Sequence, residues 1–191
     1  MNPQTWWYLS RASGMIAWMV LAATCLWGIL LITRMLKPAD RPAWLLDLHR
    51  WLGVLAIVTT AIHLLTLVAD NYVHFGWKEL FVPNGSPWKT GPVTWGVLAF
   101  YLLVVIQVSS MMMKRMPRRL WHGIHLLSYL LFVMATVHGV SAGSDHGNLM
   151  FLLVTSGVCS VVLFSFVARV LQGRAKRVVK TVGQRASSRS M

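Results

Sequence analysis

Acidic side chains are scarce in this sequence. Asp and Glu together number 5 against 18 Lys and Arg, and charged residues make up only 12% of the 191 positions. Hydrophobic residues make up 56%, which lies well outside the composition of a soluble globular domain. Without a soluble fold to display the basic residues, the net charge of +13 does not favour a nucleic-acid-binding protein. The composition instead predicts a protein that crosses a membrane several times.

Cysteine is rare as well. The sequence has two, Cys25 and Cys159, and both fall inside long apolar segments. They form no C-x-x-C motif and do not lie in a loop, so neither a disulfide framework nor a thiol redox pair is indicated. We expect both to be small buried hydrophobic side chains.

Long apolar segments dominate the rest of the sequence. Five of them contain about 20 residues or more and are nearly free of charge, which is enough to cross a hydrocarbon core about 30 Å thick as helices. They are Ser13–Thr33, Trp44–Ala69, Val93–Met113, Leu120–Val140 and Leu149–Val170. We therefore predict an all-α membrane bundle with five transmembrane helices over residues 1–173. A basic, disordered cytoplasmic tail is expected over residues 174–191.

The distribution of Lys and Arg predicts the orientation of the bundle, because cytoplasmic loops retain these residues. All of the basic residues except Arg11, Lys78 and Lys89 flank the apolar segments on one side. This pattern places the N-terminus outside and the C-terminus in the cytoplasm of an inner (plasma) membrane. Membrane lipid is the expected surrounding, and no nucleic-acid partner is expected.

Four histidines within the apolar segments are the main candidates: His49 and His63 in the second, His125 and His138 in the fourth. Ionisable residues inside membrane spans are costly and by default mark a functional site. The 14-residue step from His49 to His63 puts both rings on one helix face with a rise of about 21 Å. Because the second and fourth helices run in the same direction, His49 and His125 share the cytoplasmic level. His63 and His138 share the outer level.

The 13-residue step from His125 to His138 fits less well, because in an ideal helix it puts the two side chains about 140° apart around the helix axis. The fourth helix must bend, or the two centres must be approached from different sides, and the sequence does not decide between these. His122 lies one turn before His125 and is an alternative ligand at the cytoplasmic level, although we expect it to face the interface. His74 and His146 fall in loops and are expected to be solvated.

The type and number of these residues favour one chemistry. A neutral imidazole on each side of an iron porphyrin gives a six-coordinate, low-spin centre suited to electron transfer. We therefore predict two stacked bis-imidazole haem sites between the second and fourth helices. Zinc or copper would need three or four ligands at one level, and the segments offer no third ligand. A proton relay typically has an Asp or Glu at depth, whereas all five acids lie at or near segment ends.

A haem-free accessory or interaction subunit, in which the histidines are structural, remains the alternative from a different class. If haem is present, its anionic carboxylates favour Arg or Lys. Arg50, Arg118 and Arg119 are placed for the haem at the cytoplasmic level, and Arg11 for the outer one. Each of these charges is explained equally well as one that only sets the topology.

Two stretches carry a family resemblance: LHRWLGVLAIVTTAIHLL and RRLWHGIHLLSYLLFVMATVHG, which contain the four histidines. They resemble the ferric reductase-like transmembrane domain that eukaryotic NADPH oxidases, ferric-chelate reductases and the bacterial methionine sulfoxide reductase membrane subunit share. The resemblance covers about residues 10–170. It implies that His49 with His125 and His63 with His138 ligate two b-type haems, and the 13-residue step also recurs in the family.

The resemblance implies electron transfer from a cytoplasmic flavoprotein reductase or a quinol to an extracytoplasmic acceptor protein or ferric chelate. Family oxidases and metalloreductases continue into a flavin- and nicotinamide-binding module. This chain shows no G-x-G-x-x-G signature, so we expect it not to take hydride itself but to act as the electron-transfer component of an oxidoreductase. The stretch from GWKELFV onward looks most like the bacterial subunit, which tends to have Arg where this chain has His49. A haem at the cytoplasmic level is therefore better supported here than in that relative.

Overall fold

The computed structural model describes residues 4–34, 41–70 and 75–189, without the side chains of residues 146 and 174–189. The main helices are α1 (Gln4–Thr33), α2 (Pro42–Ala69), α4 (Thr90–Met111), α5 (Arg118–Leu126), α6 (Ser128–Ala142) and α7 (Leu149–Arg189). Shorter elements are the helix α3 (Trp77–Phe81) and the 3₁₀ turns η1 (Met113–Arg115) and η2 (Asp145–Gly147). No strand occurs within the described ranges, which confirms the predicted all-α class.

Five helical segments among the described residues are long and apolar enough to cross a membrane. They are Thr5–Thr33, Pro42–Ala69, Thr90–Met111, Arg118–Ala142 and Leu149–Gly173. Helices suit this environment because they satisfy every backbone N–H and C=O internally, where no water is present to do so. The predicted bundle of five membrane-crossing segments is thereby confirmed.

Large apolar side chains lie on the outside of the bundle. Trp51, Leu65 and Phe164 are 72%, 60% and 71% exposed. A surface of this kind is unfavourable in water but is solvated by lipid hydrocarbon. Inside the bundle, small residues such as Ala22 and Ala56, each only 2% exposed, let helices approach closely.

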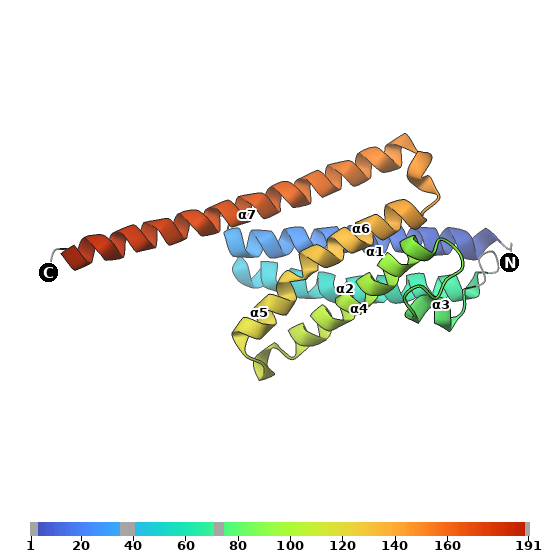
Figure 1. Ribbon diagram of the computed structural model, residues 1–191, viewed down its shortest axis with the longest axis horizontal. Helices are drawn as coiled ribbons and strands as arrows, with labels where there is room; N and C mark the ends of the chain where they lie inside the picture. The colour runs from blue at the N-terminus through green and yellow to red at the C-terminus, as the bar shows by residue number, and fades with distance from the viewer. Residues whose placement is uncertain (1–3, 35–40, 71–74, 190–191) are drawn as a thin grey trace.

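Helices α1 and α2 run antiparallel and pack along their length, and α4 packs against α6 in the same way (Figure 1). Helix α6 also contacts α1, which joins the two helix pairs into one bundle. Helix α7 packs on α1 and extends beyond the other helices, so the two chain ends lie at opposite ends of the long axis (Figure 1). The two histidine-bearing segments, α2 and α5–α6, therefore belong to different pairs of one bundle.

The fourth membrane segment is broken at Leu127. The Leu127 N–H donates to the carbonyl of Ile124 at 3.0 Å, which is a three-residue turn, and α6 starts directly afterwards. The break lies between His125 and His138. Of the two solutions to their 13-residue spacing, the structure therefore has the bend in the helix.

The C-terminal segment differs from the expectation. Where the sequence predicts a disordered tail from residue 174, the backbone of α7 continues as a helix to Arg189. Residues 174–189 consist mostly of Ala, Lys, Arg, Val and Gln with a single Gly183, and most of these residue types favour helix. Extending an existing helix also avoids the cost of nucleation.

Candidate functional site

The four membrane histidines come together as two pairs. The ring centres of His49 in α2 and His125 in α5 lie 5.9 Å apart, with an interplanar angle of 73°. Those of His63 in α2 and His138 in α6 lie 6.5 Å apart at 71°. These are the pairs that equal levels on co-oriented helices predict, and all four rings are partly buried.

The separation within each pair suits one metal ion between two imidazoles. An imidazole nitrogen binds a first-row metal ion at about 2 Å, and the ring centre lies about 1 Å behind it, so opposite ligands have ring centres about 6 Å apart. Among the described residues, His, Cys, Asp and Glu form no group of three or more that could hold a metal ion. The geometry therefore favours a metal whose remaining ligands come from a non-protein group over a zinc or copper site.

Backbone carbonyls orient the rings of the His63–His138 pair. Nδ1 of His63 lies 2.8 Å from the carbonyl oxygen of Ser10, and Nδ1 of His138 lies 2.9 Å from that of Pro92. Because a carbonyl oxygen can only accept, each Nδ1 must carry the proton. This leaves the Nε2 lone pair free to bind a metal.

The His49–His125 pair is held less tightly. Nδ1 of His125 lies 3.4 Å from Oγ of Ser110, whose hydroxyl already donates to the carbonyl of Ile106. The Ser110 oxygen is therefore the acceptor for this imidazole. Nδ1 of His49 is buried and has no hydrogen-bond partner among the described residues.

Two glycines of α1 make room for the histidines of α2. A Cβ atom at Gly14 would lie 3.0 Å from Cε1 and Nδ1 of His63, and one at Gly28 would lie 3.2 Å from Cε1 of His49. The glycines are 14 residues apart, as the histidines are, so both contacts occur in one antiparallel register. We did not predict these contacts, although the matching spacings were visible in the sequence.

Gly96 of α4 has the same role for His138. A Cβ atom there would lie 2.7 Å from Cε1 and Nδ1 of that ring. The ring donates to the carbonyl of Pro92, four residues earlier in α4, and Ser10 has the same offset from Gly14 in α1. Each of these two rings therefore packs against a glycine and donates a hydrogen bond to the carbonyl that lies one helical turn before that glycine.

A cavity of about 790 Å³ lies beside the His63–His138 pair. This volume falls within the range of roughly 300–1,000 Å³ found for ligand and cofactor sites. Helices α1, α2, α4 and α6 contribute mostly apolar lining, and both histidines belong to it. The space can therefore hold a flat apolar group in contact with both imidazoles.

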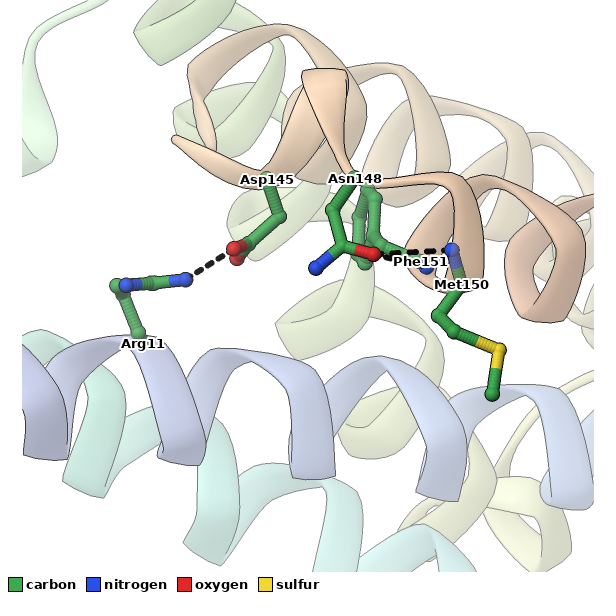
Figure 2. Close-up of polar contacts among 5 residues, drawn as sticks. All are labelled: Arg11, Asp145, Asn148, Met150 and Phe151. Atoms are coloured by element: carbon green, nitrogen blue, oxygen red, sulfur yellow. Dashed lines mark hydrogen bonds and ion pairs between the residues drawn. The ribbon is translucent and has the colours of Figure 1, made fainter.

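Arg11, which was predicted to serve the outer haem, also lines this cavity. It forms an ion pair with Asp145 in η2, as Figure 2 shows. Its Cζ lies 4.3 Å from the ring centre of Trp7, and its Nε is buried without a hydrogen-bond partner. Arg11 thus lies at the cavity beside His63 and His138, and it is paired with Asp145.

The turn that presents Asp145 is fixed by the start of α7. Oδ1 of Asn148 accepts hydrogen bonds from the backbone N–H groups of Met150 and Phe151 at 2.9 and 3.3 Å (Figure 2). Asn is a favoured residue at this capping position because it satisfies N–H groups that have no partner within the helix.

The other arginines predicted at the site are less closely involved. Nη1 of Arg50 lies 3.3 Å from Oδ1 of Asp47, and both side chains are more than 60% exposed. Arg118 and Arg119 are exposed at the start of α5. All three cations therefore lie on the outside of the bundle.

His122 is exposed, and its ring contacts Trp121 at a centroid distance of 6.1 Å. His125 carries the ring that faces α2, which favours it over His122 as the ligand candidate. Trp121 stacks on His125 at 5.2 Å and 24°. His74 lies outside the described residues, as does the side chain of His146.

Comparison with known proteins gives a family match over most of the bundle. Residues 13–136 match the family model described as ferric reductase like transmembrane component. The protein-methionine-sulfoxide reductase heme-binding subunit MsrQ of Caulobacter vibrioides is 31% identical over 119 residues, which cover 59% of this chain and 55% of that protein. The chain thus spans about half the length of this curated relative. No solved structure matches.

Proposed function

Since this chain belongs to the ferric reductase-like transmembrane component family, we propose that it is a b-type cytochrome that carries electrons across a membrane. In this proposal His49 and His125 hold one haem, and His63 and His138 hold a second. The supporting observation is that two imidazole pairs, with ring centres 5.9 and 6.5 Å apart, lie at two levels of one bundle.

The residues around the pairs fit a porphyrin. The cavity at His63 and His138 is mostly apolar, as the faces of the macrocycle require. Among the described side chains, the buried donors Arg11 Nε, Trp27 Nε1 and Trp121 Nε1 have no hydrogen-bond partner, and neither has Nδ1 of His49. Buried donors are almost always paired, and haem carboxylates would supply the missing acceptors. When bound, haem supplies the one-electron redox chemistry.

The chain itself provides ligation and insulation. The histidines of α2 hold the two levels about 21 Å apart by the helical rise. Between these levels lies a buried apolar core that includes Leu21, Leu103 and Phe132, which excludes water from the path. Two imidazoles per iron leave no open coordination position, which suits electron transfer and not the binding of a small substrate.

The electron partners follow from the sidedness that the basic residues predict. We propose a cytoplasmic flavoprotein reductase or a quinol as the donor, and an extracytoplasmic protein or ferric chelate as the acceptor. A protein acceptor has additional support, because the bacterial relative is described as a subunit of a methionine sulfoxide reductase. The inner (plasma) membrane is the proposed location.

A visible spectrum of the purified protein tests the proposal. We expect a reduced low-spin b-type spectrum and about two haems per chain, because four imidazoles form two complete axial pairs. A preparation expressed with ample haem that stays colourless would contradict the proposal and favour the haem-free accessory subunit. A ratio near one haem per chain would remove one of the two sites.

Reporter fusions test the proposed orientation. A reporter that is active only in the cytoplasm should be active when it is fused after Met191. A reporter that is active only after export should be active when it is inserted near Asn84, because basic residues avoid the loops on that side. The reverse pattern would invert the proposed direction of electron transfer.

A further inference from the structure

Arg169 of α7 is a half-buried cation on a membrane-crossing segment. Its Nη1 donates to the hydroxyl of Tyr129 in α6, and its Cζ lies 5.6 Å from the centre of that ring. Both contacts are with a neutral side chain, whereas a charge within a membrane span normally pairs with an opposite charge. Tyr129 follows His125 by four residues, which is about one helical turn.

A second donor lies beside the same imidazole. Trp121 stacks on His125, and its Nε1 is buried without a hydrogen-bond partner. Buried N–H groups without an acceptor are rare in native structures and call for an explanation. A cation held one turn after His125 and an unused N–H group one turn before it therefore flank this imidazole along the segment, and neither has an anionic partner among the described side chains.

From these contacts we infer that Arg169 and Trp121 form the subsite that binds a carboxylate of the haem at the His49–His125 pair. This inference rests on the proposed function. A guanidinium with an additional N–H donor is well suited to a carboxylate, which accepts several hydrogen bonds. Arg169 thereby takes the role that the sequence suggested for Arg50 and Arg118.

Tyr129 is the positioning residue of this subsite. Its hydroxyl accepts the hydrogen bond from Arg169, and its ring packs on Phe166 of α7 at a centroid distance of 4.6 Å. The phenol thus positions the guanidinium of Arg169. Because the phenol is neutral, it leaves the positive charge of Arg169 available to a carboxylate. Tyr129→Phe should loosen Arg169 and produce a smaller effect than loss of the cation.

Redox titration of the purified haem-loaded protein tests the inference. Arg169→Gln should shift the reduction equilibrium of one haem about tenfold toward the oxidised form, which is about 59 mV for one electron. An unpaired carboxylate near the iron stabilises the ferric state, which explains the direction. Arg169→Lys should shift it less, and Arg50→Gln, whose cation is exposed and paired with Asp47, is the matched control without a shift.

Iron protoporphyrin dimethyl ester separates a contact with the carboxylate from a general effect of charge. Arg169→Gln should weaken the binding of iron protoporphyrin at the His49–His125 pair but not the binding of the dimethyl ester, which has no free carboxylate. If Arg169→Gln does not fold, Trp121→Phe serves instead, because it keeps an aromatic ring at that position and removes the indole N–H. It is measured with iron protoporphyrin and with its dimethyl ester.

Three results would overturn the assignment. These are an unchanged potential in Arg169→Gln, an equal loss of affinity for iron protoporphyrin and for its dimethyl ester, and a potential shift seen only in vesicles with anionic lipids. The last would identify a lipid phosphate as the ligand. All three leave the haem content of the wild type intact, so they differ from a failure of the proposed function, in which the wild type itself binds no haem.

Discussion

Replacing His63 or His138 with alanine is expected to lower the haem content from two per chain to one and to stop electron delivery to an external acceptor. Each site loses one of its two axial ligands, and a haem with a single imidazole is held less tightly. The remaining His49–His125 pair lies about 21 Å further from the outer surface by the helical rise. Haem content, the reduced spectrum and acceptor reduction measure the effect.

The complementary variants His49→Ala and His125→Ala should block entry of electrons from the cytoplasmic side. The haem at the outer level should persist and be reducible only by small reductants added outside. His122→Ala is the matched control, because this exposed residue lies one turn from His125, and it should retain both haems. The same loss in all four ligand variants would show that the sites are not independent.

Gly96→Ala should remove the haem at the His63–His138 pair without changing any ligand. The added Cβ would lie 2.7 Å from two atoms of His138, so the ring must move and give up its hydrogen bond to Pro92. Overpacking of this kind costs about 1–3 kcal/mol of folding stability. Haem content and thermal unfolding in detergent would both report the change.

Gly91→Ala is the control on the same helix, because no atom lies within 4 Å of a Cβ at that position. Alanine favours helix over glycine by up to about 1 kcal/mol, so this variant should be neutral or slightly stabilising. Gly28→Ala should be milder than Gly96→Ala, since its closest approach to His49 is 3.2 Å. Equal behaviour of Gly96→Ala and Gly91→Ala would mean that the glycine does not define the position of His138.

Hydropathy and helical spacing were sufficient to predict the five membrane segments and the pairing of the histidines. They could not locate the break in the fourth segment, because Leu127 lies in the sequence HLLSY, which contains neither Pro nor Gly. The phase mismatch between His125 and His138 required a bend but did not fix its place. The helical continuation to Arg189 was missed because a basic, polar composition predicts disorder, whereas the helix predicted directly before this segment allows it to continue as helix.

At the site, the residues that act through packing were the ones that escaped prediction. Gly14 and Gly28 become significant only when α1 is placed antiparallel to α2 in one register. Arg169 counts in the sequence only among the basic residues that predict topology, because nothing in its local sequence shows that α7 brings it to Tyr129. Contacts between helices of different segments depend on rotation about each helix axis, which an almost uniformly apolar sequence leaves open.

The break at Leu127 also has a consequence for motion. A three-residue turn has poorer hydrogen-bond geometry than an α-helical one, and such a turn within a helix often acts as a hinge. Here it separates α5, which carries His125 and Trp121, from α6, where His138 is held by Pro92. A partner or lipid that pushes on α5 can therefore tilt one imidazole while the other stays in place. In the proposed electron path, this would let the entry point respond to its surroundings while the exit point keeps its geometry.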